Sequence, residues 1–182
     1  MSTQGGLDEL PGELMMWVLI VSELLVFAAG LTAFLAVRLT DPVGFAEAQD
    51  HLYRTGAALN TAVLITSGFL AAQALVWRRV GKRALARVAL VAAAALGVLF
   101  LVIKGAEYAG KAAQGIAWDT HPFFTFYYGL TGFHAAHVVA GVLLLLLVAW
   151  RDASQNIEAS AMFWHMVDLV WVLLFPVIYL LG

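Results

Sequence analysis

Residues 14–37 read LMMWVLIVSELLVFAAGLTAFLAV, and this stretch decides the fold. The apolar run is long enough to cross a hydrocarbon core of about 30 Å as a single helix. Glu23 is the only ionisable side chain within it. A carboxyl at that depth is costly unless it is protonated or partnered, so we treat Glu23 as a candidate functional residue.

The composition of the whole chain agrees with a membrane location. The 182 residues are 63% hydrophobic and only 12% charged, and the mean hydropathy is +0.88. Soluble domains are nearer to about 25% charged, which excludes an ordinary soluble domain. The net charge of −2 and the absence of a basic tail argue against a nucleic-acid partner. The absence of cysteine excludes disulfides, thiolate metal sites and iron–sulfur clusters.

Four further apolar runs follow the first, each of about 20 residues or more. Because no water is available at that depth to bond the backbone, each run must be helical. The sequence therefore predicts an all-α integral membrane bundle of five transmembrane helices over residues 14–182, preceded by a short tail, residues 1–13. The predicted spans are Leu14–Val37, Ala57–Trp77, Ala84–Ile103, Phe124–Trp150 and Ala161–Leu181.

The basic residues predict the orientation. The densest group lies in the short connector 78–83, and cytoplasmic connectors carry an excess of Lys and Arg. We therefore expect the N-terminus in the cytoplasm and the C-terminus in the periplasm. Arg78 and Arg79 are candidates for contact with lipid or the membrane interface, as are Trp164 and Trp171. We also expect Lys104 to extend to the interface, and Glu107 and Lys111 to form a surface pair, since they are spaced i,i+4.

Five polar residues are predicted to gather inside the bundle. His134 and His137 are spaced i,i+3 and so share a helix face, as do His165 and Asp168. With helices that alternate in direction, these four and Glu23 fall in one layer near the bilayer centre. Such a cluster could relay protons, contact a lipid head group or partner, hold a metal or haem, or simply hydrogen-bond helices together.

A metal or haem site is less favoured by these residues. A di-iron bundle needs more carboxylates than this chain offers in its apolar runs. Two histidines on facing helices could ligate a haem, with His134 or His137 opposite His165, so a bis-His membrane haem protein is one alternative. A stand-alone proton or solute transporter is another, although one core carboxylate and unbroken helices argue against it. We expect no metal and no cofactor in this chain.

Several motifs resemble one family. The segment FWHMVDLVW at 163–171 resembles the WHFVDVVW signature of cytochrome c oxidase subunit III, and TGFHAAHV at 131–138 resembles its TGFHGxHV segment. LNTAVLITSG at 59–68 is similar to the family's LNTxxLLxSG segment. Ser22-Glu23 resembles its SE pair, whose glutamate is the carbodiimide-reactive carboxyl of the family, and Glu107-Tyr108 resembles its EY pair.

The resemblance implies a role in respiration. The long form of the family has seven helices, and no counterpart of the first two is seen here. Five-helix members occur in bacterial quinol oxidases and beside nitric oxide reductase, and the start GELMMW at 12–17 looks more like the nitric oxide reductase accessory form. The resemblance thus implies a subunit without a redox centre in a bacterial inner-membrane haem–copper complex. It would support assembly, stability and proton uptake beside a catalytic, haem-containing transmembrane subunit, with a bound phospholipid in some members.

Overall fold

The structure is a computed structural model that describes residues 14–151 and 154–181. Its described part is all-helical, with five helices long and apolar enough to cross a membrane. The predicted fold class and the five spans are thereby confirmed, whereas the orientation of the termini stays a prediction. The predicted tail, residues 1–13, lies outside the described residues. The helices are α1 (Leu14–Arg38), α2 (Pro42–Asp50), α3 (Arg54–Arg79), α4 (Arg83–Ala113), α5 (Pro122–Arg151), α6 (Ser154–Phe175) and the π-helix η1 (Pro176–Leu180).

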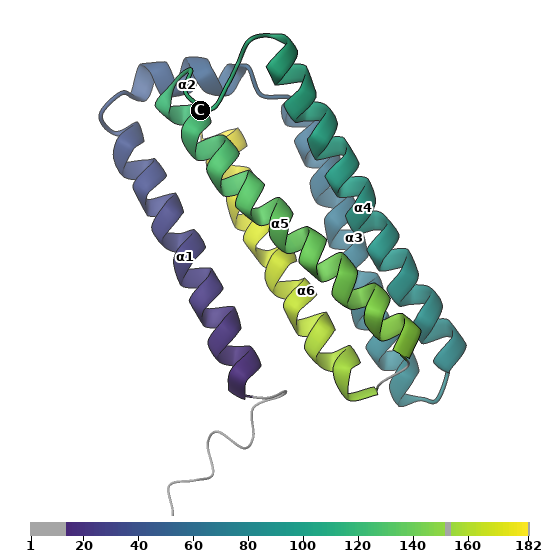
Figure 1. Cartoon of the computed structure of the whole chain (residues 1–182). Helices are drawn as coiled ribbons and strands as arrows, with labels where there is room; N and C mark the ends of the chain where they lie inside the picture. The colour runs from purple at the N-terminus through teal and green to yellow at the C-terminus, as the bar shows by residue number, and fades with distance from the viewer. Residues whose placement is uncertain (1–13, 152–153, 182) are drawn as a thin grey trace, which may run out of the picture.

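Helix α6 occupies the middle of the bundle (Figure 1). It packs against α1, α3 and α5, while α3 and α4 form a long antiparallel pair and α1 packs against α5 and α6 at the edge. Small residues line the contact between α3 and α4, where Ala71, Ala74, Ala93 and Ala94 are fully buried. Small side chains let helices approach closely, which is how helices associate in lipid, where water does not drive apolar groups together.

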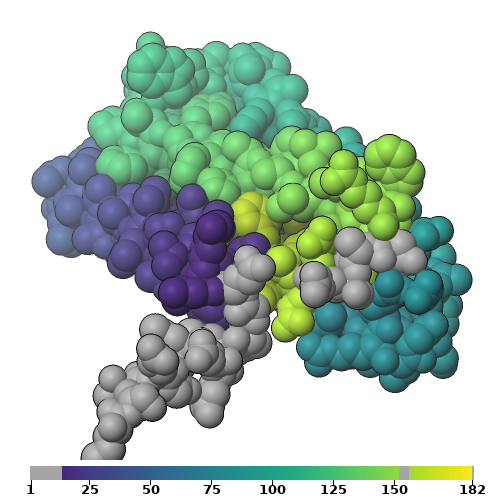
Figure 2. Space-filling model, turned by 60° about the horizontal axis from the view of Figure 1, so that its bottom comes forward, coloured from purple at the N-terminus to yellow at the C-terminus, as the bar shows by residue number. Residues whose placement is uncertain are grey.

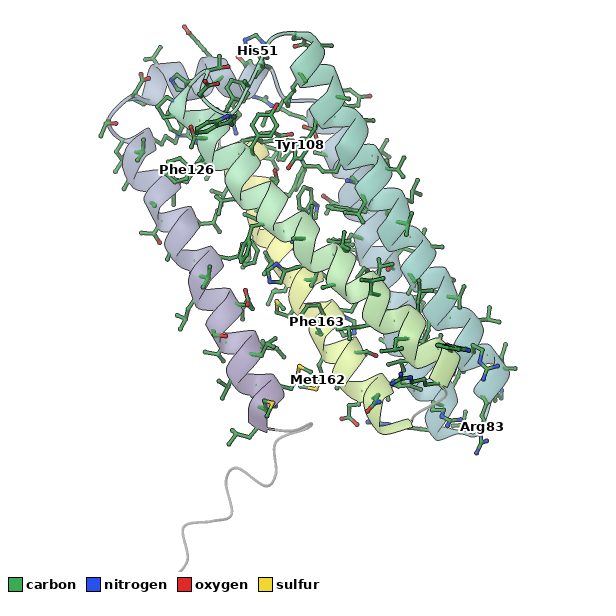
Figure 3. All side chains as sticks on the ribbon, in the orientation of Figure 1. His51, Arg83, Tyr108, Phe126, Met162 and Phe163 are labelled. Atoms are coloured by element: carbon green, nitrogen blue, oxygen red, sulfur yellow. The ribbon has the colours of Figure 1, made fainter. Side chains whose placement is uncertain are left out.

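The two ends of the bundle differ in charge. The connector between α3 and α4 holds Arg78, Arg79, Lys82 and Arg83, and we call this the basic end. Helix α2, the connector between α4 and α5, and η1 lie at the other end, which we call the α2 end (Figure 1). Figure 3 shows Arg83 and His51 at these opposite ends.

Helix α2 was not predicted, because it lies within a connector of mixed composition between the first two apolar runs. Asp41 caps it, accepting a hydrogen bond of 3.0 Å from the Gly44 backbone N–H, and Pro42 occupies its first turn. His121 Nε2 lies 3.2 Å from Asp41 Oδ2, which ties α2 to the start of α5. The Gly44 N–H and His121 both lower the pKa of Asp41, because each stabilises the carboxylate.

The end of the chain is held by an amide from α2. Pro176 has no N–H and ends the α-helical pattern of α6, and the chain continues as a π-helical turn. Gln49 Nε2 donates a hydrogen bond of 2.8 Å to the carbonyl of Ile178. Because Gln49 is buried, this bond satisfies a polar group inside the bundle and fixes η1 against α2.

Candidate functional site

Glu23 meets a histidine of α5. His137 Nε2 lies 3.1 Å from Glu23 Oε2, and both side chains are partly buried, at 14% and 26% exposed. The two atoms are close, but the pair does not have the alignment of a hydrogen bond, since Oε2 has no hydrogen-bond partner among the described residues. Of the two histidines proposed from the sequence, His137 is therefore the one that faces Glu23.

The other ring nitrogen of His137 fixes the chemistry of this pair. Nδ1 lies 2.9 Å from the Phe133 carbonyl oxygen, which can only accept, so Nδ1 carries a proton. A neutral His137 ring then presents Nε2 as an acceptor toward Glu23. The carboxyl oxygen and the imidazole nitrogen are 3.1 Å apart, within the distance over which a proton can pass once the two groups are aligned. This geometry can store or pass a single proton at the contact between α1 and α5.

His134 lies apart from this pair, in an aromatic enclosure. Its side chain is fully buried, and neither ring nitrogen has a hydrogen-bond partner within the described residues. The ring stacks on Trp171 with centroids 5.1 Å apart and meets the edge of Phe100 at 5.6 Å. One helical step of three residues turns a side chain by about 60°, which separates His134 from His137.

His165 and Asp168 form a second pair, on α6. His165 Nδ1 lies 3.7 Å from Asp168 Oδ2. The carboxyl faces α3 at Gly68, where a Cβ would collide with Asp168 Oδ2. The predicted cluster would bring this pair together with Glu23 of the first span and the two histidines of the fourth. The structure places it against α3 instead, because Gly68 leaves room there for the carboxyl.

The five residues of the predicted polar cluster do not form one hydrogen-bonded network within the part of the chain that the structure describes. Glu23 with His137, His134, and His165 with Asp168 occupy three separate places, and no hydrogen bond or ion pair between described residues joins them. Side chains at the same depth still point to different neighbours, because depth does not fix the direction around each helix.

The two tryptophans of α6 are buried, so their predicted contact with lipid is wrong. Trp164 is fully buried and donates from Nε1 to Ser67 Oγ at 3.1 Å. Trp171 is 1% exposed and donates from Nε1 to Thr61 Oγ1 at 2.9 Å. Each indole finds a hydroxyl partner on α3, which makes burial of its N–H inexpensive.

A charged cluster near the α2 end was missed by the sequence analysis. Lys104 is 2% exposed, and its ammonium group lies 3.0 Å from Glu107 Oε2 and 3.2 Å from Tyr127 Oη, with Tyr179 Oη as a third close partner. Its Nζ is 4.7 to 5.3 Å from the ring centroids of four aromatic side chains, a cation–π environment. Those rings belong to Tyr108, Tyr127, Trp171 and Tyr179.

Lys111 completes this cluster. It is 4% exposed, and its Nζ donates to the His51 carbonyl at 3.2 Å and lies 3.9 Å from Glu107 Oε1. The expectation that Lys104 extends to the interface, and that Glu107 and Lys111 form a surface pair, is wrong. Helix α4 continues past the predicted end at Ile103 to Ala113, so these side chains stay on its buried face.

The spacing of residues along α4 could have predicted that these charged side chains are buried. Gly97, Phe100, Lys104, Glu107 and Lys111 follow one another at steps of three and four residues, which keeps them on one face. The first two are buried core positions. The charged residues continue the core stripe of α4, and this periodicity could have placed them inside the bundle.

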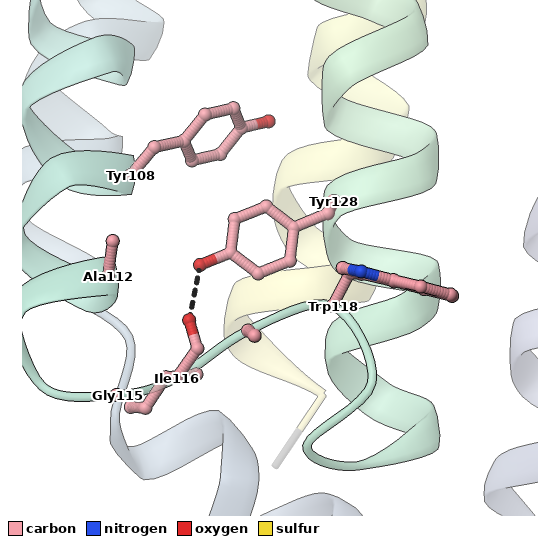
Figure 4. A pocket seen from close by; sticks show the side chains of 7 residues that line it. Tyr108, Ala112, Gly115, Ile116, Trp118 and Tyr128 are labelled. Carbon is pink, nitrogen blue, oxygen red and sulfur yellow. Dashed lines mark hydrogen bonds between the residues drawn. The ribbon is translucent and has the colours of Figure 1, made fainter.

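Two of the surface hollows lie at opposite ends of the bundle. At the α2 end a hollow of about 540 Å³ is lined by aromatic and small apolar groups, and Figure 4 shows Tyr108, Tyr128 and Trp118 around it. The Tyr128 hydroxyl donates to the Ile116 carbonyl at 3.0 Å. With no charged side chain in its lining, this hollow suits apolar material rather than an ion.

A hollow of about 360 Å³ lies at the basic end. Its lining includes Arg78, Arg79 and Arg83 together with Glu158. Arg79 lies 3.8 Å from Glu158, and both side chains are well exposed. Contact of Arg78 and Arg79 with lipid head groups stays a prediction.

The geometry defines a class of protein. It is a multi-pass all-α membrane protein whose buried polar side chains pair with other helices or stack on rings. Within residues 14–151 and 154–181, no three His, Asp or Glu side chains are grouped as metal ligands. His137 faces α1 and His165 faces α3, an arrangement that does not favour the bis-His haem alternative.

Comparison with known proteins gives the family. Residues 11–182 match the family described as Cytochrome c oxidase subunit III. The chain is 32% identical over 171 residues to cytochrome c oxidase subunit 3 of Synechocystis sp., covering 89% of this chain and 72% of that protein. It is 25% identical over 174 residues to cytochrome bo(3) ubiquinol oxidase subunit 3 of Pseudomonas aeruginosa, covering 91% and 83%. The chain belongs to the cytochrome c oxidase subunit III family.

One further relative is named for two subunits. The chain is 30% identical over 180 residues to heme-copper oxidase subunit I+III of Aeropyrum pernix, covering 91% of this chain and 22% of that protein. The chain thus spans about a fifth of a protein whose name joins the two subunits. Membership of the haem–copper oxidase subunit III family and a multi-pass membrane location follow from these matches and the five apolar helices.

Proposed function

We propose that this chain is the non-catalytic subunit III of a bacterial inner-membrane haem–copper complex, an oxidase or a nitric oxide reductase. In that role it supports assembly, stability and proton uptake, and its partner is a catalytic, haem-containing transmembrane subunit. The fused relative named for subunits I and III supports such a partner. The Glu23–His137 pair is the single observation that carries the proton-handling part of the proposal, since it sets a carboxyl oxygen 3.1 Å from an imidazole nitrogen at the contact between α1 and α5.

Purification of the native complex in mild detergent tests this proposal. We expect mass spectrometry to find the chain with a haem-containing membrane protein, and the absorption of haem to follow that protein after dissociation. Turnover with oxygen and with nitric oxide then assigns the acceptor. Isolation of the chain without any haem protein would contradict the proposal.

The predicted orientation is checked with reporter fusions, which should place the connector 78–83 in the cytoplasm.

Substitutions of Glu23 separate a structural from a proton-transfer role. In Glu23→Gln the amide can donate to His137 Nε2, so we expect the yield of the complex to stay near the wild-type value. In Glu23→Ala the imidazole loses its partner, at a cost of about 1–3 kcal/mol, and the yield should fall. If the pair passes protons, both variants should lower turnover, because neither side chain can exchange a proton at neutral pH.

Yield and turnover of the purified complex are measured for both variants. Ser22→Ala is the matched control on the same helix, because the Ser22 hydroxyl donates to the Leu19 carbonyl of its own helix and to no other helix among the described residues. We expect this control to leave both quantities unchanged. Full yield together with full turnover in both Glu23 variants would show that the carboxyl has neither role.

A further inference from the structure

Another hollow lies at the α2 end, between the loop that joins α2 to α3 and the last turns of α4. Its volume is about 410 Å³. Figure 3 shows His51, one of its lining residues, at this end of the bundle. Unlike the apolar hollow of Figure 4, this one is lined by polar and ionisable side chains, so it can hold a polar ligand. These side chains are His51, Tyr53, Glu107, Lys111 and Gln114.

Lys111 is a buried cation that lines the hollow and uses only part of its hydrogen-bonding capacity. Its side chain is 5% exposed, and its Nζ makes one hydrogen bond to a described residue, of 3.2 Å to the His51 carbonyl. Glu107 Oε1 is 3.9 Å from Nζ, which is beyond hydrogen-bond length. Because an ammonium group has three N–H donors, two of them remain for a ligand in the hollow.

The charges beside the hollow do not balance. Glu107 is already matched by Lys104, at 3.0 Å, and it accepts from the Tyr179 hydroxyl at 3.1 Å. Lys111 is thus a second ammonium group beside one carboxylate. The C-terminal end of α4 carries about half a negative charge, which offsets Lys111 only in part. A buried cation is costly without a counter-charge, so this part of the bundle favours an anion.

The start of α3 adds N–H donors to the same hollow. In this fully described first turn, Tyr53 gives no side-chain cap and no residue is acidic. Gly56, in that turn, is one of the lining residues. The N–H groups of a first turn have no partner within their own helix, and the N-terminus carries about half a positive charge. Together with the buried ammonium group of Lys111, this end of α3 makes the hollow electropositive.

We propose that this hollow binds an oxyanion and that its ligand is a phosphate group. Lys111 and the first-turn N–H groups of α3 hold the phosphate oxygens, and the exposed Gln114 amide and Tyr53 hydroxyl donate to them from the rim. A phosphate group suits this arrangement, because it offers several oxygens to donors that converge from two helices. The site lies apart from the Glu23–His137 pair and goes beyond the proposed function.

The phosphate group has two possible sources, free phosphate and the head group of a lipid. Both present the same oxygens to Lys111. Apolar residues, Ile103 and Ala106, also line the hollow, and they would contact the chains of a lipid but not a free ion. The two sources therefore differ in how much binding depends on attached acyl chains.

Equilibrium dialysis of the native complex against radiolabelled phosphate tests the site. The complex is first washed in detergent to remove exchangeable lipid. Lys111→Met keeps the length of the side chain but removes its charge, so we expect it to weaken phosphate binding at least tenfold. Lys82→Met is the matched control, an exposed lysine at the basic end, which comes forward in Figure 2. This control should bind phosphate as the wild type does.

Gln114→Ala provides a second variant that does not depend on a buried position. Gln114 is exposed on the rim, so its loss should leave the bundle folded even if Lys111→Met fails to assemble. We expect it to weaken phosphate binding about three- to tenfold, as for one hydrogen bond. Equal affinity in the wild type and both of these variants would overturn the site.

Competition by short-chain lipids identifies the source of the phosphate group. Dioctanoyl phosphatidic acid is the competitor, and dioctanoylglycerol, which lacks the phosphate, is its control. Displacement by the phosphatidic acid at concentrations far below that of phosphate would assign a lipid head group, and displacement only at similar concentrations would assign free phosphate. Displacement by both lipids alike, or no saturable binding of either phosphate or phosphatidic acid, would overturn the oxyanion site.

Discussion

Replacing Glu107 by alanine is expected to destabilise the bundle by about 3–5 kcal/mol, the cost of leaving a buried charge without its partner. Lys104 and Lys111 are 2% and 4% exposed, and Glu107 is the only carboxylate paired with either among the described residues. Its removal leaves two ammonium groups near one another at the α2 end. The change is measured as a shift in the denaturant midpoint of the purified chain in detergent.

The matched control is Glu158→Ala, which removes a glutamate from an exposed pair. Arg79 and Glu158 are 3.8 Å apart, with side chains 67% and 37% exposed. Such surface pairs contribute about 0–1 kcal/mol, so the control should change the midpoint little. A second substitution, Lys104→Met in the Glu107→Ala background, should recover part of the loss, because one uncompensated charge disappears. Similar midpoints for the two single variants would contradict the buried cluster.

The spans of this bundle could be predicted because the membrane leaves few choices. An apolar run of about 20 residues must be helical where the backbone has no water to bond. The connectors are less constrained, which is why α2 was missed. Its formation depends on the Asp41 cap, on Pro42 in the first turn, and on burial of Phe45 and Gln49 against other helices. The burial of these side chains depends on tertiary contacts, which cannot be read from the nine residues of α2 alone.

The sequence identified the residues of the polar site but not how they are arranged in space. The sequence limited the partner of Glu23 to His134 or His137, and the choice depended on a rotation of about 60° around α5. Trp164 and Trp171 resembled interface residues because tryptophan is common there. Their burial depends on hydroxyl partners at Ser67 and Thr61, more than 90 positions earlier in the chain. Pairing over such a distance requires the packed structure.

Trp164 of α6 contacts three other helices. Its ring lies in a slot between α4 and α5, where Gly97 and Gly141 present no side chain. A Cβ at Gly97 would approach the ring to 2.6 Å, and one at Gly141 would also collide with it. The indole therefore fills the space that two glycines leave, while its N–H bonds Ser67 of α3. One side chain of α6 thus holds three other helices in register.

Trp164→Ala is accordingly expected to cost about 3–5 kcal/mol, through the cavity that it leaves and the lost hydrogen bond. Thermal unfolding in detergent measures it, with Trp150→Ala as the matched control. Trp150 is 80% exposed at the end of α5, so its removal should leave the midpoint almost unchanged. Gly141→Val should cost about 1–3 kcal/mol by overpacking against the same ring.

The double variant Trp164→Ala with Gly141→Val decides whether the two positions share this slot. Because valine would then occupy part of the emptied space, its effect in the Trp164→Ala background should be smaller than in the wild type, or reversed in sign. Strict additivity of the two free-energy changes would show that the ring and the glycine do not meet, since only distant and independent sites add. In that case the position of the Trp164 ring between α4 and α5 would be wrong.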